Sequence, residues 1–321
     1  EKAAYYAGII MGRNPDVSYG TYRLLSFDEL WKKSGFDESE HMFSVRTRSA
    51  DEEYGNGVHQ WYCGMQDAGG VLQKGPWVGN RFHWYCLFDN EDYRITKGVK
   101  HRFQYDSQVK NGRGYYYPGT PEYKLMATGK NMDDVKVQEP VAPFNDGLTY
   151  TNSISSNCLA FTTKYADVTD PTIGRTDAYW PFLRYADIVL IYAEAQCELN
   201  DGISQDAIDA LNDIRIRSNA KEASVTGDGA IETKVELRSV IFEERAKELA
   251  YEGDRRWDLL RWGIYLDVMN SLGGINEDGT RTPFDEGSIN KRREFRHLLY
   301  PLPSLEVSTN MAIDKNNPGW N

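Results

Sequence analysis

The clearest periodic pattern of apolar residues in this chain lies at residues 237–263. Apolar side chains recur there at the spacing of one helix face, at Phe242, Ala246, Leu249 and Ala250. Gly253 follows the last of these turns, where a left-handed residue can close a helix, and Asp254 stands at the N-cap position of a second helix. That helix carries its own stripe, at Trp257, Leu260, Ile264 and Val268. The short linker makes the two predicted helices antiparallel neighbours.

Charged residues are dense in the same stretch. They are Glu243, Glu244, Arg245, Lys247, Glu248, Arg255, Arg256, Asp258 and Arg261. On a solvated face, a pair such as Glu243–Lys247 contributes roughly 0.2–0.5 kcal/mol. Exposed pairs of this kind account for some of these charges. They do not account for so many charged residues in a stretch that also contains two tryptophans.

A second helix pair is predicted at 185–218. Its first stripe is Ile188, Ile191, Tyr192, Ala195 and Leu199, and its second is Ala207, Ile208, Leu211 and Ile214. Asp201-Gly202 breaks the chain between them, and Ser204 can cap the second helix. With 233–270 as the other pair, we expect a mainly α-helical fold with tetratricopeptide-like helix pairs, although the usual repeat consensus is not legible.

The rest of the chain is poor in long periodic runs. Residues 50–180 hold many Gly, Asn, Asp and Pro between short aromatic segments, which indicates loops and short strands. We therefore expect one domain over 1–321, with a loop-rich ligand-binding part at 1–180 and a helical scaffold at 181–270. An extended C-terminal segment at 271–321 completes it. Binding residues tend to lie on long loops held by a rigid scaffold.

Composition narrows the possible functions. The net charge of −11 argues against nucleic acid and against a polybasic membrane surface. The sequence lacks GxSxG, HExxH, a P-loop and a dinucleotide fingerprint, so we assign no catalytic residue and no enzyme activity. The five histidines show no metal-ligand spacing and are predicted at the surface. We expect no cofactor and no metal, and calcium at Asp89, Glu91 and Asp92 is a minor alternative.

The four cysteines are Cys63, Cys86, Cys158 and Cys197. Cys197 lies on a predicted helix between apolar residues, which favours a buried free thiol. Cys63 and Cys86 lie in one loop-rich region and are the best candidates for a disulfide, although four thiols allow three pairings.

Three segments together resemble a known family. EERAKELAYEGDRRWDLLRWG at 243–263 is similar to the signature of the SusD/RagB family, the surface nutrient-binding lipoproteins of Bacteroidota. WPFLRYADIVLIYAEAQCELN at 180–200 resembles the family's helix entered from an arginine-bearing strand. LLYPLPSLEVSTNMAIDKNNPGW at 298–320 resembles its C-terminal ending. The order and spacing of the three segments also match, and they lie within about the last 140 residues.

This resemblance implies a SusD-like fold and a non-catalytic protein that binds oligosaccharides at the cell surface. It also implies a SusC-like TonB-dependent transporter of the outer membrane as partner, and a membrane attachment only through an N-terminal lipid anchor that this chain does not contain. We expect Glu1 not to be the natural start. Two alternatives stay open: a RagB-like protein that binds peptides, and a glycoside hydrolase. The resemblance also makes Lys164 and Tyr165 structural.

The candidate site rests on exposed aromatic rings. A pyranose has an apolar face that stacks on Trp or Tyr, and hydroxyls that pair with amides and guanidinium groups. Trp77 lies between Gly75-Pro76 and Gly79-Asn80, so turns on both sides can push its ring outward. We predict Trp77 as the main platform; the other predicted ligand-binding residues are Trp61, Tyr62, Trp84, Asn80, Arg81 and Tyr116. The tryptophans predicted to be structural are Trp31, Trp180, Trp257, Trp262 and Trp320.

Overall fold

The computed structural model describes the side chains of most of this protein. They are those of residues 1–14, 17, 21–36, 39–49, 54–67, 69–79, 84, 87–105, 160–270 and 293–320. Backbone alone is described for residues 37, 113–116, 125–127, 135–137, 149–152, 271, 274–275 and 281–282. The chain forms two compact units, residues 1–126 with 137–252, and residues 127–136 with 253–321.

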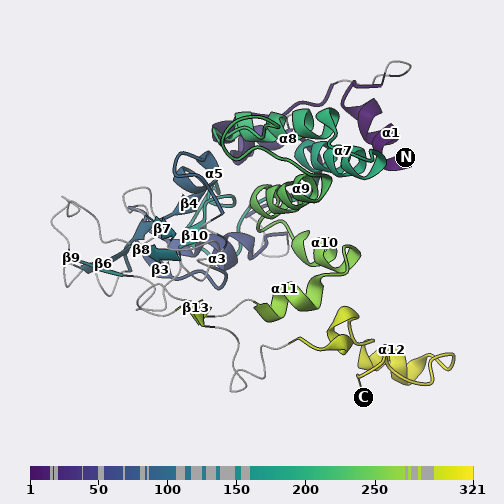
Figure 1. Cartoon of the computed structure of the whole chain (residues 1–321). Coiled ribbons are helices and arrows are strands. Elements are labelled where there is room, and N and C mark those ends of the chain that lie inside the picture. The colour runs from purple at the N-terminus through teal and green to yellow at the C-terminus, as the bar shows by residue number, and fades with distance from the viewer. Residues whose placement is uncertain are drawn as a thin grey trace. The chain divides into compact units, whose positions relative to one another are not determined.

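The first unit is built on helices that lie side by side (Figure 1). They are α1 (Lys2–Ile10), α7 (Tyr185–Leu199), α8 (Gln205–Arg217) and α9 (Lys234–Glu248), and α7 contacts each of the other three. Ser204 caps α8, because its hydroxyl accepts a hydrogen bond from the Ala207 amide. Thr233 and Glu236 form a capping box at the start of α9. The pair predicted at 185–218 is therefore confirmed.

Apolar residues of α7 and α8 form the larger hydrophobic core. Fully buried members include Leu190, Ala193, Cys197, Ala207, Leu211 and Ile214. Leu237 and Ile241 join them from α9. These positions reproduce the stripes expected from the sequence, and the mainly α-helical fold is confirmed.

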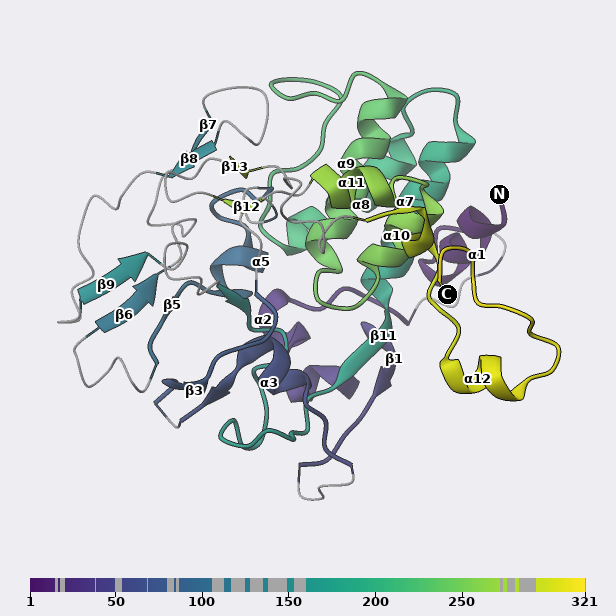
Figure 2. The ribbon, with the colours of Figure 1, turned by 90° about the horizontal axis from the view of Figure 1, so that it is seen from below.

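The remaining elements of the first unit are short. The helices are α2 (Phe27–Leu30), η1 (Lys33–Asp37), α3 (Val58–Cys63) and α5 (Tyr93–Thr96). β1 (His41–Val45) pairs antiparallel with β11 (Trp180–Arg184), which leads directly into α7, as Figure 2 shows. A second core lies beside this sheet and contains Leu30, Trp31, Cys63 and Tyr165.

Small sheets complete the loop-rich part. β2 (Met65–Gln66) pairs with β3 (Leu72–Lys74), and β4 (Val99–Lys100) pairs with β10 (Phe161–Thr162). β6 (Arg113–Tyr116) lies between β5 (Arg102–Phe103) and β9 (Thr149–Asn152). β7 (Leu125–Ala127) pairs with β8 (Val135–Val137). Each of these strands is two to four residues long, so the sheets are small. The loop-rich part therefore depends on contacts with the neighbouring helices to hold its elements in place.

Buried charges tie these short elements to α9. Five acidic residues, Glu40, Asp92, Glu244, Glu248 and Glu252, meet five basic residues, Arg94, Lys164, Arg184, Arg215 and Arg217. All ten side chains except that of Arg215 are buried. The charged positions of the signature stretch are thus largely internal, and a solvated face does not account for them.

Arg184 stands at the centre of this cluster and is 1% exposed. Its guanidinium donates to Glu40 at 2.6 Å, to Glu252 at 2.6 and 2.8 Å, and to Glu248 at 3.1 Å. The surrounding arginines hold the pKa of Glu248 below its ordinary value despite burial. Lys164 donates to Glu252 and to two backbone carbonyls of the 248–250 turn, and the Tyr165 hydroxyl donates to Tyr251. The structural roles expected of Lys164 and Tyr165 are confirmed.

The second unit contains α10 (Arg255–Arg261), α11 (Tyr265–Ser271), β12 (Gly274–Ile275), β13 (Arg281–Thr282), η4 (Phe295–Leu298) and α12 (Ser304–Thr309). Arg256 donates to the Tyr265 hydroxyl and to the His297 carbonyl. The Trp320 indole donates to the carbonyl of Arg296, so its structural role is confirmed. The expected extended end is interrupted by η4 and α12, the latter beginning after Pro303, whose φ of −54° suits a helix start.

Two expectations from the pattern need correction. Trp257 is 58% exposed, so its prediction as a core residue is wrong. Asp254 occupies the N-cap position of α10 without capping it through its side chain. Gly253 does take a positive φ, of 100°, as predicted. The pairing of α9 with α10 stays a prediction, because the division between the two units falls at Gly253.

Cysteine and histidine placements also differ from expectation. Cys63 is a free, fully buried thiol that donates to the Thr162 carbonyl, so the suggested bridge to Cys86 is wrong. Burial raises the pKa of this thiol to about 12, which makes it unreactive. Cys197 is free and buried, as predicted. His59 is buried against the Tyr165 carbonyl rather than at the surface, because α3 packs on the segment after β10.

No helix in the described part of the chain has the length and apolar character needed to cross a membrane.

Candidate functional site

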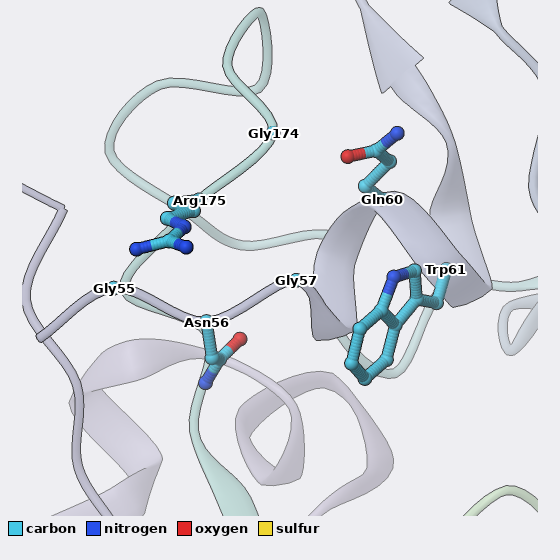
Figure 3. A pocket seen from close by; sticks show the side chains of 7 residues that line it. All are labelled: Gly55, Asn56, Gly57, Gln60, Trp61, Gly174 and Arg175. Carbon is cyan, nitrogen blue, oxygen red and sulfur yellow. The ribbon is translucent and has the colours of Figure 1, made fainter. Parts of the chain in front are cut away.

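A hollow of about 500 Å³ opens at the N-terminal end of α3 (Figure 3). Its lining residues are Gly55, Asn56, Gly57, Gln60, Trp61, Gly174 and Arg175. Gln60 and Trp61 project from α3, and Arg175 lies across the hollow in the segment before β11, with its side chain beside Gly55. The site therefore joins two stretches more than a hundred residues apart in the sequence.

Asn56 holds these two stretches together. Its backbone exchanges hydrogen bonds with Thr176, at 3.0 and 2.8 Å. Its side-chain amide donates to the Ala178 carbonyl and to the Thr47 hydroxyl, while its oxygen accepts from the Val58 amide at the start of α3. Asn56 is thus committed to the structure, and it leaves ligand contacts to its neighbours.

Glycines allow the side chains of the hollow to lie directly on the backbone. A β-carbon on Gly57 would lie 2.9 Å from the Trp61 ring, and one on Gly174 would lie 2.7 Å from Oε1 of Gln60. A β-carbon on Gly55 would lie 3.0 Å from Arg175. Distances this short require a shift, so the three glycines set the shape of the hollow.

Trp61 and Trp77 are the exposed tryptophans of this region, and Tyr54 before Gly55 is exposed as well. The two tryptophan side chains are 44% and 75% exposed. The backbone amides of Trp77 and Val78 both donate to the Trp61 carbonyl, at 2.9 and 3.0 Å. These two hydrogen bonds fix the turn that carries Trp77 to α3. The Trp77 ring can therefore be exposed on a defined turn, as the flanking glycines and proline predicted.

Polar groups without protein partners lie beside these rings. The Gln60 side-chain amide and the indole N–H groups of Trp61 and Trp77 make no hydrogen bond to the residues that the structure describes. Arg175 supplies a positive charge to the same hollow. Apolar ring faces next to amide and guanidinium donors match the two surfaces of a sugar.

Tyr62 and Trp84 are placed differently from Trp61 and Trp77. The Tyr62 ring packs against Tyr165, Trp180 and Tyr251, with ring centres 5.4 to 6.0 Å apart. Burial accordingly raises the pKa of the Tyr62 hydroxyl. The Trp84 indole donates to the Ala246 carbonyl of α9 at 2.8 Å. Both rings anchor the loops to the second core or to α9.

Three further predicted residues are not brought into this picture. Asn80 and Arg81 lie outside the described residues. Tyr116 is described only as backbone in β6, paired with Arg102 and Asn152. Sequence reasoning missed Gln60, Arg175 and the glycines beside them. The Gly-Asn-Gly run at 55–57, just before Trp61, was the one local signal available.

The described residues contain no group of three or more His, Cys, Asp or Glu side chains arranged to hold a metal ion. Asp92, named as a possible calcium ligand, caps α5 and pairs with Arg94 at 2.7 Å. Asp89 accepts a hydrogen bond from the Lys221 amide.

Comparison with known proteins assigns the family. The model of the SusD family matches residues 66–320, which is most of the chain. The chain belongs to the SusD family. Among curated relatives of this family, SusD-like protein P2 of Formosa agariphila is 34% identical over 142 residues, which cover 43% of this chain. That match spans only 25% of the relative's length.

Solved SusD structures share the fold. A SusD homolog from Bacteroides thetaiotaomicron superposes with a TM-score of 0.65 at 21% identity, covering 99% of this chain and 59% of that one. Surface glycan-binding protein A from the same organism, in complex with laminarihexaose, gives a TM-score of 0.58 at 18% identity, with 98% and 59% covered. The chain thus spans under two thirds of these structures and a quarter of the curated relative.

Proposed function

We propose that this SusD-family protein binds oligosaccharides without cleaving them, at the face formed by Trp61 and Trp77 beside the α3 hollow. The observation that carries the proposal is the pair of exposed indoles at α3, one of which lines a hollow with Arg175 and with a Gln60 amide that has no hydrogen-bond partner among the described residues. A sugar ring stacked on either indole would place hydroxyls within reach of these donors. The solved relative with laminarihexaose supports a glycan as ligand class.

Binding at this face is expected to be weak. Covering about 100 Å² of apolar surface is worth roughly 2.5 kcal/mol, and two platforms must also offset the ordering of a flexible sugar chain. Dissociation constants in the micromolar to millimolar range suit a protein that captures a chain and then releases it. Rapid release fits the second part of the proposal, delivery to a SusC-like TonB-dependent transporter in the outer membrane.

Calorimetric titration with laminarihexaose and a panel of other oligosaccharides tests the binding role. New reducing ends are assayed in the same samples, and a mixed peptide pool is titrated in parallel. Saturable glycan binding without cleavage supports the proposal. Cleavage of an oligosaccharide would instead support the glycoside hydrolase alternative. Binding of peptides alone would support the RagB-like alternative.

Delivery and location need the full-length protein in its own cell. We expect a lipidated, surface-exposed protein that copurifies with a TonB-dependent transporter after mild detergent extraction. Protease added to intact cells should cleave it. A protein that resists protease until the cells are broken, and that purifies without a transporter, would contradict this part of the proposal.

A further inference from the structure

A second hollow, of about 510 Å³, lies where the segment before α2 passes the end of α8. Its lining residues are Tyr22, Arg23, Leu24, Leu25, Ser26, Tyr185, Asp213, Ile216 and Arg217. We call it the α8 hollow. It belongs to the helical part of the first unit and shares no lining residue with the site at α3.

The segment on one side of the α8 hollow has unused backbone groups. Among the described residues, the N–H and C=O groups of Tyr22, Arg23 and Leu24 have no hydrogen-bond partner, and pairing resumes only at Leu25, whose amide donates to Glu40 at 2.6 Å. Arg23 is exposed, whereas Tyr22 and Leu24 are half-buried on the larger core. Alternation of this kind is typical of a strand, and an unpaired strand offers its backbone to another chain.

Arg217 supplies donors on the other side. Its side chain is only 6% exposed, and its Nη2 donates to Glu248. Its Nε and Nη1 atoms are buried without a hydrogen-bond partner among the described residues, although Nη1 lies 3.5 Å from a Glu40 oxygen. Buried donors left unpaired destabilise a protein, so a turn of the Arg217 side chain that brings them to a carbonyl or carboxylate of a ligand would be favoured.

The charges of the α8 hollow select the sign of its occupant. Arg23 and Arg217 line it; Arg217 is paired with Glu248, and the one acidic lining residue, Asp213, is paired with Arg13 at 2.6 Å, so the exposed Arg23 is the lining charge without an ion pair among the described residues. This basic lining stands out in a chain whose net charge is −11. Ile216, 61% exposed, adds an apolar contact surface.

We propose that the α8 hollow docks an extended, acidic segment of a partner protein. The segment pairs as a strand with the backbone of residues 22–24, and one of its oxygens accepts from Arg217. A peptide fits better than a glycan because its N–H and C=O groups repeat at the spacing of the unused groups on 22–24. The docking is independent of glycan binding at α3.

Synthetic peptides test the proposal directly. The probe is an acetylated and amidated hexapeptide of alternating valine and glutamate, and its controls carry lysine for glutamate or methyl groups on alternate amides. We expect the acidic peptide to bind at least tenfold more tightly than either control. It should also slow amide hydrogen exchange in residues 21–26. Equal binding of acidic and basic peptides, or unchanged exchange in this segment, would overturn the proposal.

Variants place the contact on the named residues. Arg23→Glu is expected to lower the affinity for the acidic peptide at least fivefold. Lys32→Glu makes the same charge change at another exposed position and should leave that affinity unchanged. Arg217→Lys removes Nε and Nη1 while keeping a charge for Glu248, and should weaken binding at least threefold. If that variant does not fold, Arg23→Glu decides. Protection of 21–26 by polygalacturonate, with no effect of the peptide, would overturn the peptide assignment.

Discussion

At the scale of single residues, the buried charges are the feature that local sequence pattern could not reveal. Glu244, Lys247 and Glu248 have the spacing of exposed helix pairs. Lys247 does pair locally with Glu243, but Glu244 and Glu248 are buried against Arg94, Arg184 and Arg217, which lie far away in the sequence. Burial and pairing must therefore be considered together, because an isolated buried charge is costly, whereas a fully paired one is tolerated.

Removing one member of this cluster should be strongly destabilising. Glu252→Gln deprives Arg184 and Lys164 of a charged partner in the interior, and we expect the free energy of unfolding to fall by about 3–5 kcal/mol. The matched control is Glu198→Gln, which breaks an exposed pair with Arg238 and should cost at most about 1 kcal/mol. Urea denaturation measures both. Equal losses in the two variants would show that the buried cluster does not hold the fold.

A half-buried histidine, His41, and a buried one, His59, contribute to the pH dependence of stability. Burial lowers the pKa of His41 to about 4 and also lowers that of His59, from an ordinary value near 6.5. The unfolded chain therefore binds more protons between these values, so the stability contributed by each neutral ring is complete above about pH 6.5. It is lost as the pH falls toward the folded-state pKa.

Denaturation melts at several pH values check this sign. We expect the midpoint urea concentration to fall steadily from pH 6.5 to pH 4.5, and His41→Gln to flatten part of that slope. The carboxylates with lowered pKa, Glu244, Glu248 and Glu252, lose their contributions at lower pH, below their ordinary range. Burial raises the pKa of Glu40, which acts in the opposite direction, so the comparison with His41→Gln is decisive: an unchanged slope in that variant would contradict the placement of His41.

At the scale of elements, helix positions followed from the pattern more reliably than contacts did. The stripes and the Ser204 cap predicted α7 and α8 because each signal is local. The exposure of Trp257 was mispredicted because a stripe does not say which neighbour will cover it. The short helix α3, six residues long, was harder to predict. Its position depends on the Gly55-Asn56-Gly57 run before it and on backbone hydrogen bonds between Asn56 and Thr176, which the fold brings together from far apart in the sequence.

The glycine before α3 provides a test of how this element shapes the site. A β-carbon at Gly57 would lie 2.9 Å from the Trp61 ring, so Gly57→Ala should displace the indole and weaken oligosaccharide binding about three- to tenfold. Gly202→Ala is the control, because no atom lies within 4 Å of the added carbon. Titrations of both variants with one oligosaccharide decide the point. Unchanged affinity for Gly57→Ala would separate the Trp61 ring from the ligand.

At the scale of the whole molecule, the family signature and the binding face carry different information. The motif at 180–200 falls on β11 and α7, and the motif at 243–263 covers the charged end of α9, the following turn and α10; Arg184, Glu248 and Glu252 from these motifs hold the buried cluster. They therefore predicted family and fold well and said nothing about the ligand. Trp77 was predicted from the turns around it and Trp61 from an aromatic cluster, and both lie exposed, but Gln60 and Arg175 required the fold to bring 55–61 next to 174–175.

The central claim is that the exposed rings of Trp61 and Trp77 bind the oligosaccharide. The most direct measurement is calorimetric titration of Trp77→Ala with the best-binding oligosaccharide, beside Trp257→Ala, which removes another exposed indole from α10. We predict a loss of about 1–3 kcal/mol in binding free energy for Trp77→Ala, with little change in melting temperature. Trp257→Ala should bind like the parent. Equal affinities of Trp77→Ala and the parent protein would contradict the account.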